Sequence, residues 1–305
     1  MNDNAKAMVM ASFVGDALSL GVHWVYNTNV IDKKYGRVTN MLAPKLASFH
    51  RGKSDGDFTH YGDQTLLLLE SVASGNGFDP NRFADDWCGF FEGYEGYIDK
   101  ATQITQANFK AGKNADTAGS ESEDLGGPAR MAPLVYMYQD DPDRLIEVVK
   151  VQTMMTHDGP EIVATAEFFA RTVLTVINGE TPRTAMEGVM DTYFNRPPFN
   201  EWVPQGLDTE AIDSRTAIKD FGQMCEVQAA FPSTVHLVAR YQEDLEQALV
   251  ENIMAGGDSA ARGLVTGMIL GAYHGMDAIP ERWLNGLKAY DRIIALLDRI
   301  DTDRQ

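Results

Sequence analysis

Cysteine is almost missing from this sequence, since only Cys88 and Cys225 occur among 305 residues. Two cysteines cannot form a disulfide framework for a chain of this length, and neither stands in a spacing typical of metal ligands. We therefore expect both thiols to be reduced and structural, which argues against a disulfide-stabilised secreted scaffold.

Long hydrophobic runs are missing as well. No segment approaches the roughly 20 apolar residues that a membrane-spanning helix needs. The first residues lack the basic region of a signal peptide, and Asp16 interrupts their apolar stretch. We expect a cytoplasmic protein without a membrane partner.

Positive charge is scarce. The chain has 26 Lys and Arg against 44 Asp and Glu, which gives a formal net charge of −18. A surface this acidic repels the phosphate backbone of nucleic acids at long range, and the sequence contains no basic patch to offset the repulsion. No nucleic-acid partner is expected.

Alternating apolar and polar residues, the pattern of half-buried strands, are rare. Apolar residues recur instead at three and four positions, which predicts helices throughout and an all-α fold. The start signals agree, because proline at a first helical position is well tolerated. Such starts occur at Asp141-Pro142, Thr181-Pro182 and, without a polar cap, Ile279-Pro280.

The expected layout has a buried central helix over residues 161–177, which carries apolar residues around most of its circumference and stops at Asn178-Gly179. Periodicity fades over residues 27–60 and 194–215, where glycine, proline, aspartate and asparagine accumulate, so we expect long loops there. Loops of that length are usually functional. No internal repeat or low-complexity linker divides the chain, which favours one domain over residues 1–305.

Two early aspartates are candidates for chemistry. Asp16 stands among small and apolar residues, where it either faces a solvent-filled edge of the first helix or contacts a ligand. Asp63 precedes a run of leucines. It either caps the helix that follows, or it belongs to a helix N-terminus that binds phosphates or sugar hydroxyls.

The late segment around Asp258 gives a sharper signal. Asp258 or Ser259 is expected to cap a helix in which Gly263, Gly267 and Gly271 recur every four residues. Each glycine inside a helix costs about 1 kcal/mol relative to alanine, so three on one face indicate very close packing. The favoured partner of this stripe is the backbone of a neighbouring helix.

Two further motifs have both a plain and a functional interpretation. Asp124 belongs to an acidic run that turns through Gly126 and Gly127, either as a solvated turn or as part of a site. His157 precedes the central helix, where it either contacts a ligand or forms a hydrogen bond across a turn.

Six ordered segments together carry a resemblance that covers nearly the whole chain. They are GDALSLGVHW, FTHYGDQTLLLLES, DLGGPARMAPL, THDGPEIVATAEFFA, CEVQAAFPSTVHLVARY and NIMAGGDSAARGLVTGMILGAYHG. In order and spacing they resemble the ADP-ribosylglycohydrolases and their crystallin-like relatives. The resemblance implies an orthogonal multi-helix bundle in a single domain, with a cleft where two magnesium ions orient the terminal ribose. It also implies cleavage of the N- or O-glycosidic bond that links ADP-ribose to a side chain.

The magnesium motifs of this family are only partly present. By resemblance, Asp63 and Asp258 are the metal ligands that remain. Two carboxylates with waters hold one magnesium ion weakly and are a poor basis for a two-metal site. The residues that stand at the other ligand positions are Gly62, Gln64, Ala260 and Ala261.

Two compensations for the missing ligands are conceivable. Asp55, Asp57 or His60 lends a replacement ligand if the upstream loop folds inward. Alternatively, Arg262 points inward, pairs with Asp258 one turn earlier and fills the space of a metal, so that the site is metal-free.

The resemblance also implies functional roles. Asp124 matches a catalytic aspartate of some members and is expected to act as a general base or to orient water. The sequence thus predicts a hydrolase acting on a small-molecule or protein-linked ADP-ribosyl or related ribosyl conjugate. The alternative is a non-catalytic relative that binds ADP-ribose or a nucleotide, or keeps only the fold. The expected substrate contacts are Asp16, Asp63, Gln64, Gly126, Gly127, Arg130, His157 and Ser259.

Overall fold

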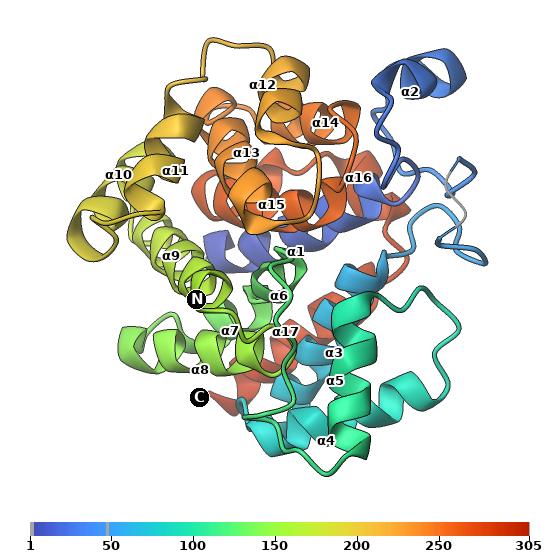
Figure 1. Ribbon diagram of the computed structural model, residues 1–305, viewed down its shortest axis with the longest axis vertical. Helices are drawn as coiled ribbons and strands as arrows, with labels where there is room; N and C mark the ends of the chain where they lie inside the picture. The colour runs from blue at the N-terminus through green and yellow to red at the C-terminus, as the bar shows by residue number, and fades with distance from the viewer. Residues whose placement is uncertain (1–2, 47–48, 305) are drawn as a thin grey trace.

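The computed structural model describes residues 3–46 and 49–304, and in these ranges every regular element is a helix (Figure 1). The predicted all-α multi-helix fold is confirmed. The helices are α1 (Asp3–Ser19), α2 (Thr28–Tyr35), α3 (His60–Gly75), α4 (Pro80–Glu92), α5 (Lys100–Lys110), α6 (Gly126–Ala129), α7 (Ala132–Tyr138), α8 (Pro142–Met154), α9 (Pro160–Ile177), α10 (Pro182–Tyr193), α11 (Phe199–Leu207), α12 (Ser214–Phe221), α13 (Val227–Arg240), α14 (Leu245–Met254), α15 (Ser259–His274), the 3₁₀ turn η1 (Met276–Ala278), α16 (Glu281–Gly286) and α17 (Tyr290–Asp303).

The expected helix boundaries are confirmed where proline marks them. Asp141 accepts a hydrogen bond from the backbone N–H of Arg144 and caps α8, and Thr181 caps α10 in the same way. Helix α16 begins after Pro280 without a side-chain cap. Helix α9 ends before Gly179, whose φ of +105° is a conformation that glycine adopts at little cost.

The two predicted long loops are partly wrong, because each contains helix. Residues 27–60 include α2, and residues 194–215 include α11 and the start of α12. In α11 the apolar residues Phe199, Val203 and Leu207 follow at four-residue spacing and are buried. Prolines before and within this helix gave the segment the composition of a loop, which obscured a short amphipathic pattern.

Helices α1 and α15 form the centre of the molecule, where they lie side by side (Figure 1). Both are buried around almost their whole circumference. A Cβ atom placed on Gly15 would lie 2.1 Å from the carbonyl oxygen of Gly263, and one on Gly267 would lie 2.1 Å from that of Ala11. The glycine stripe therefore packs against a helix backbone, as predicted.

The remaining helices surround this pair. Helices α9, α13 and α14 contact α15, whereas α7, α3 and α17 contact α1. Within the described residues, one large hydrophobic core runs from α1 to α17, and a small second cluster consists of Ile218, Leu237 and Ala255. The arrangement brings the first turn of α3 close to the start of α15, because Tyr61 reaches Asp258 there.

Isolated backbone bridges tie the loops around this meeting point. Val25 pairs with Gly257, and Asp124 pairs with Glu226. These pairs hold the segment after α1 and the segment before α6 against the starts of α15 and α13. Irregular chain segments are thereby fixed where the candidate site lies.

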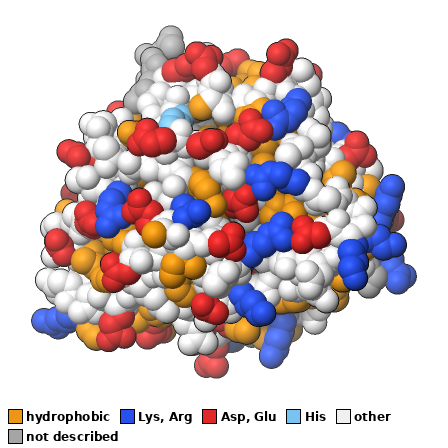
Figure 2. Space-filling view, turned by 90° about the horizontal axis from the view of Figure 1, so that it is seen from above, with side chains coloured by type: hydrophobic (Ala, Val, Ile, Leu, Met, Phe, Trp, Pro, Cys, Tyr) orange, Lys and Arg blue, Asp and Glu red, His pale blue; other side chains and the backbone are white. Residues whose placement is uncertain are grey.

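The surface shown in Figure 2 carries acidic and basic side chains interspersed across one face. Among the described helices, none is both long and apolar enough to cross a membrane. Both cysteines are free thiols, as expected.

Candidate functional site

Tyr61 connects two carboxylates at the junction of α3 and α15. Its hydroxyl lies 2.9 Å from Asp124 Oδ2 and 3.2 Å from Asp258 Oδ2. A phenol has one hydrogen and can donate to only one of these oxygens at a time. Both contacts can be hydrogen bonds when one carboxyl of the pair carries a proton and donates it to the Tyr61 oxygen, while the Tyr61 hydroxyl donates to the other carboxyl.

Asp124 is the member of the pair that faces solvent in part. Its Oδ1 accepts a hydrogen bond of 2.7 Å from the backbone N–H of Gly126, at the start of α6. Burial, followed by repulsion from Asp258, raises the pKa of Asp124 to about 7. A carboxyl group with such a pKa exchanges protons near neutral pH, which suits general acid–base chemistry.

Asp258 is fully enclosed. The indole Nε1 of Trp24 donates to its Oδ2 at 2.9 Å, while its Oδ1 has no hydrogen-bond partner in the described part of the chain. Burial raises the pKa of Asp258, and the Trp24 hydrogen bond opposes the rise. Asp258 is the N-cap residue of α15, as expected, but its side chain makes no capping hydrogen bond.

Asp124 opens onto a groove of about 780 Å³ between α5, the segment before α6 and the start of α13. This volume falls in the range of small-molecule sites. The groove is lined mainly by charged and small residues, and its carboxylates outnumber its lysines. Its charged lining residues are Asp99, Lys100, Lys113, Glu121, Glu123, Asp124 and Glu226.

Asp16 holds the N-terminus of α3. Its carboxylate accepts hydrogen bonds from the Thr59 hydroxyl at 2.6 Å and from the backbone N–H groups of Thr59 at 2.8 Å and Gly62 at 3.2 Å. Asp16 is 0% exposed, so the expectation that it faces a solvent-filled edge is wrong. Burial raises the pKa of Asp16 to about 6 against the effect of the Thr59 bonds.

Replacement of Asp16 by alanine is expected to lower the free energy of unfolding by about 2 kcal/mol at pH 5. At this pH the folded-state pKa of about 6 keeps most of the Asp16 carboxyl protonated, so the substitution does not also remove an unfavourable buried charge. It leaves buried donors of Thr59 and Gly62 without their acceptor, and a buried donor without a partner costs about 1–3 kcal/mol. Urea unfolding measures the change. The matched control is Asp191→Ala on the exposed side of α10, and equal stability of the two variants would contradict this role for Asp16.

Asp63 has polar partners other than those of Asp124 and Asp258. Its Oδ2 lies 2.5 Å from Lys53 Nζ and accepts a hydrogen bond of 2.6 Å from Tyr94. Thr59 is the N-cap of α3, so the capping interpretation of Asp63 is wrong. The ammonium group of Lys53 occupies the position next to Asp63 where a cation would bind.

Gln64, Arg130 and His157 belong to one buried polar network. The Arg130 guanidinium donates to Gln64 Oε1 and to the Thr156 hydroxyl, both at 2.5 Å, and that hydroxyl lies 2.8 Å from His157 Nδ1. These side chains are at most 3% exposed. They fix the positions of α3, α6 and the segment before α9 relative to one another.

Gly126 and Gly127 are required by close packing in α6. A Cβ atom on Gly126 would lie 2.0 Å from the ring of Tyr61, and one on Gly127 would lie 2.7 Å from the ring of His157. Any side chain at these positions would displace Tyr61 or His157. The two glycines thus allow the backbone beside Asp124 to approach the site.

Arg262 points inward. This orientation was one of the two ways in which the sequence could compensate for the missing metal ligands. Its guanidinium donates to Asn252 at 3.1 Å and to the carbonyl oxygen of Gly256 at 2.7 Å. The predicted ion pair with Asp258 is wrong, because these groups take the guanidinium instead. Of the upstream alternatives, Asp57 binds Ser54 and Lys288, Asp55 is exposed, and His60 is buried near the site.

The residues around Asp63 and Asp258 do not suit two magnesium ions. Magnesium requires oxygen ligands in nearly octahedral geometry. Here Lys53 pairs with Asp63, the buried Arg262 adds a positive charge near Asp258, and Gln64 is bound to Arg130 and Trp87. The apolar side chains of Ala260 and Ala261 add no ligand.

Sequence reasoning missed several residues that the structure brings to the site. Tyr61 and Trp24 bind the carboxylate pair, and Cys225 offers its thiol within 4.8 Å of both carboxylates. Tyr61 and Trp24 lie inside segments that carry the family resemblance, so their positions were available as a signal. Cys225 had no spacing motif to mark it.

Comparison with known proteins gives consistent matches. The family model described as ADP-ribosylglycohydrolase matches residues 1–305. Crystallin J1A of Tripedalia cystophora is 25% identical and covers 98% of this chain and 96% of its own length. ADP-ribosylhydrolase ARH3 of Homo sapiens is 25% identical over 28% of this chain and 26% of its own. A solved structure described as an ADP-ribosylglycohydrolase-related protein complex shares the fold, with a TM-score of 0.75, 22% identity and coverage of 100% of this chain and 99% of that chain.

Proposed function

Because this chain belongs to the ADP-ribosylglycohydrolase family, we propose that it hydrolyses the N- or O-glycosidic bond of an ADP-ribosyl or related ribosyl conjugate. The observation that carries the proposal is the Asp124–Tyr61–Asp258 arrangement at the groove. It supplies a carboxyl group that titrates near neutral pH beside a space large enough for a ligand.

In the proposed reaction Asp124 is the general base. The ionised Asp124 accepts a proton from a water molecule, and the oxygen of that water forms a bond to the anomeric carbon of the ribose. The glycosidic bond breaks as the anomeric carbon gains positive charge, and its electron pair leaves on the nitrogen or oxygen of the departing group. The departing group takes up a proton from solvent water and Asp124 returns its proton to the solvent, which completes the hydrolysis.

Asp258 is a positioning residue in this scheme. Its exposed fraction is 1%, so it acts through Tyr61 and by repelling the charge of Asp124. The oxygens of the two carboxyl groups lie within 4.8 Å of each other, which leaves no room between them for a sugar ring and a water. Asp124 and Asp258 therefore act from one side of the substrate.

The first test is hydrolysis of N-linked and O-linked ADP-ribosyl peptides, followed by chromatography of released ADP-ribose. We expect the initial rate to be unchanged within about twofold when millimolar Mg²⁺ is added, because the family magnesium ligands are missing or neutralised here. A rate that rises tenfold or more with Mg²⁺ would contradict the metal-free assignment of Asp63 and Asp258. Absence of hydrolysis on every conjugate would contradict the proposed activity.

A family member that binds a ribosyl ligand without cleaving it is the second candidate. The incomplete magnesium motif favours it, because Gly62, Ala260 and Ala261 supply no side-chain ligand. Calorimetric titration with ADP-ribose separates the two candidates. Binding without any turnover supports this second function, whereas binding with turnover supports hydrolysis.

A further inference from the structure

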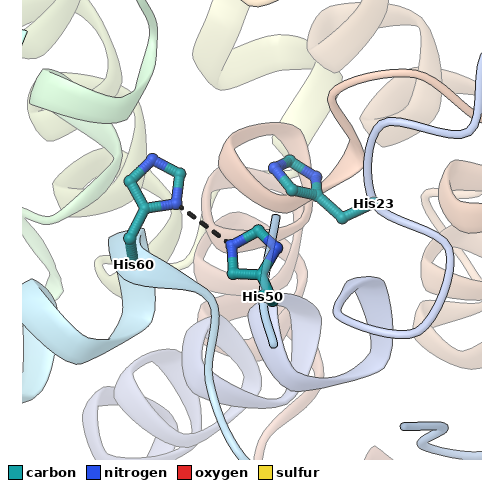
Figure 3. Close-up of side chains that lie close together, drawn as sticks. All are labelled: His23, His50 and His60. Atoms are coloured by element: carbon teal, nitrogen blue, oxygen red, sulfur yellow. Dashed lines mark hydrogen bonds between the residues drawn. The ribbon is translucent and has the colours of Figure 1, made fainter. Parts of the chain in front are cut away.

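Three buried histidines converge on the side of Trp24 and Tyr61 (Figure 3). His23 follows α1, His50 belongs to the loop before α3, and His60 is the first residue of α3. Each is 1% exposed. One ring nitrogen from each lies within 4.8 Å of the other two, and His50 Nε2 and His60 Nδ1 form a hydrogen bond of 3.3 Å that an ion bound between them would replace.

Among the residues that the structure describes, neither ring nitrogen of His23 has a hydrogen-bond partner. A buried polar group without a partner is unfavourable and rare in folded proteins, so it requires an explanation. The Asp258 carboxylate is the nearest acidic group, with its unpartnered Oδ1 3.9 Å from His23 Nδ1. A cation bound by His23 would provide a partner for the ring and a favourable charge for this oxygen.

We propose that His23, His50 and His60 bind one divalent transition-metal ion of the zinc class. Zinc binds histidine nitrogens at about 2.0–2.1 Å in tetrahedral geometry, so two such nitrogens lie about 3.4 Å apart. The 3.3 Å between His50 Nε2 and His60 Nδ1 agrees with that spacing. Three histidines with a position left for water or substrate are one known ligand set for zinc.

Asp99 provides the second feature of a histidine metal site. Its Oδ2 lies 3.3 Å from His60 Nε2, the ring nitrogen that does not face His50. The contact is at ion-pair distance but lacks hydrogen-bond geometry, and His60 Nε2 has no hydrogen-bond partner among the described residues. A metal on the inner nitrogen would make the outer N–H a stronger donor toward this carboxylate, the arrangement that orients ligand histidines in metal sites. The rings of Trp24 and Tyr97 contact His50 and His60 and limit access of water to the cluster.

This site lies beside the magnesium motif of the family, since His23 faces Asp258 and His60 precedes Asp63, but its ligands are nitrogens and it does not depend on the proposed hydrolysis. Imidazole nitrogens suit zinc, copper, iron and nickel, whereas magnesium prefers oxygen. The cluster contains three of the six histidines in the sequence. His274, at the end of α15, binds the carbonyl oxygen of Gln242 instead and serves as a matched control.

The experiment is calorimetric titration of the metal-stripped full chain with Zn²⁺. We expect one ion per chain. His23→Gln and His60→Gln are each expected to raise the Kd for Zn²⁺ by at least about 100-fold. Asp99→Asn is expected to raise it by about 10–100-fold. His274→Gln should leave the Kd within about twofold. The proposal would be overturned if the unaltered protein did not bind one Zn²⁺ per chain. It would also be overturned if His274→Gln raised the Kd as much as the substitutions in the cluster.

A measurement on the unaltered protein guards against variants that fail to fold. Co²⁺ replaces zinc with similar geometry, and its visible absorption is intense in four- or five-coordinate sites but weak in six-coordinate ones. We expect the intense spectrum, and we expect Zn²⁺ but not a hundredfold excess of Mg²⁺ to abolish it. A weak six-coordinate spectrum, or displacement of Co²⁺ by Mg²⁺, would also overturn the proposal. Neither outcome depends on hydrolysis of any conjugate.

Discussion

Replacement of Gly267 by alanine is expected to lower the free energy of unfolding by about 3 kcal/mol or more. The new Cβ atom would lie 2.1 Å from the backbone carbonyl oxygen of Ala11 in α1. Because that neighbour is the backbone of a buried helix, the steric overlap can be relieved only if α1 and α15 move apart in the core. Urea unfolding followed by circular dichroism measures the loss.

The control for this variant is Gly188→Ala in the interior of α10. A Cβ atom at Gly188 would meet no atom within 4 Å. This substitution is expected to stabilise the protein by about 1 kcal/mol, since alanine is a better helix former than glycine. If Gly267→Ala also stabilised the protein, the close contact between α1 and α15 would be refuted.

Replacement of Asp124 by asparagine is expected to lower kcat/KM by a factor of about 10² to 10⁴ on a conjugate that the protein hydrolyses. This is the usual loss when a general base is removed, because asparagine cannot accept a proton from water. In the unaltered protein kcat/KM should rise with pH through about 7, the pKa of Asp124. That rise should be missing from the residual activity of the variant.

Stability distinguishes this loss of activity from a loss of fold. Burial raises the pKa of Asp124 from 3.8 to about 7, so its protonated form is favoured in the folded chain. The contribution of the raised Asp124 pKa to the free energy of unfolding is complete below pH 3.8 and disappears as the pH rises through 7. Asp124→Asn should therefore be at least as stable as the unaltered protein at pH 8. Asp191→Asn is the activity control, and an unchanged kcat/KM for Asp124→Asn would refute the proposed base.

Much of the fold was predictable from local patterns. The prolines after Asp141 and Thr181 mark helix starts because their fixed φ and missing N–H suit a first turn. The Gly263, Gly267 and Gly271 stripe indicated a close helix contact, but nothing local identified α1 as the partner. Helix α11 was missed because its prolines outweighed a short apolar pattern.

The site was less predictable, because its geometry depends on contacts between distant residues. Asp124 was singled out by resemblance, and the structure places it beside Asp258, 134 positions later by residue number. Asp16 and Asp63 are both near Tyr61 in the fold, but their partners are Thr59, Lys53 and Tyr94. The three histidines come from separate segments, so no spacing in the sequence indicates that they meet.

The pairing of α1 with α15 also bears on how the chain folds as the ribosome makes it. The Ser19 hydroxyl in α1 lies 3.1 Å from the carbonyl oxygen of Ser259, 240 residues later. At about 5–20 residues per second, α1 waits roughly 12 to 50 s for its partner to be synthesised. During that interval the apolar surface of α1 lacks its native cover, so translation of this protein should place an unusual demand on chaperones that bind nascent chains.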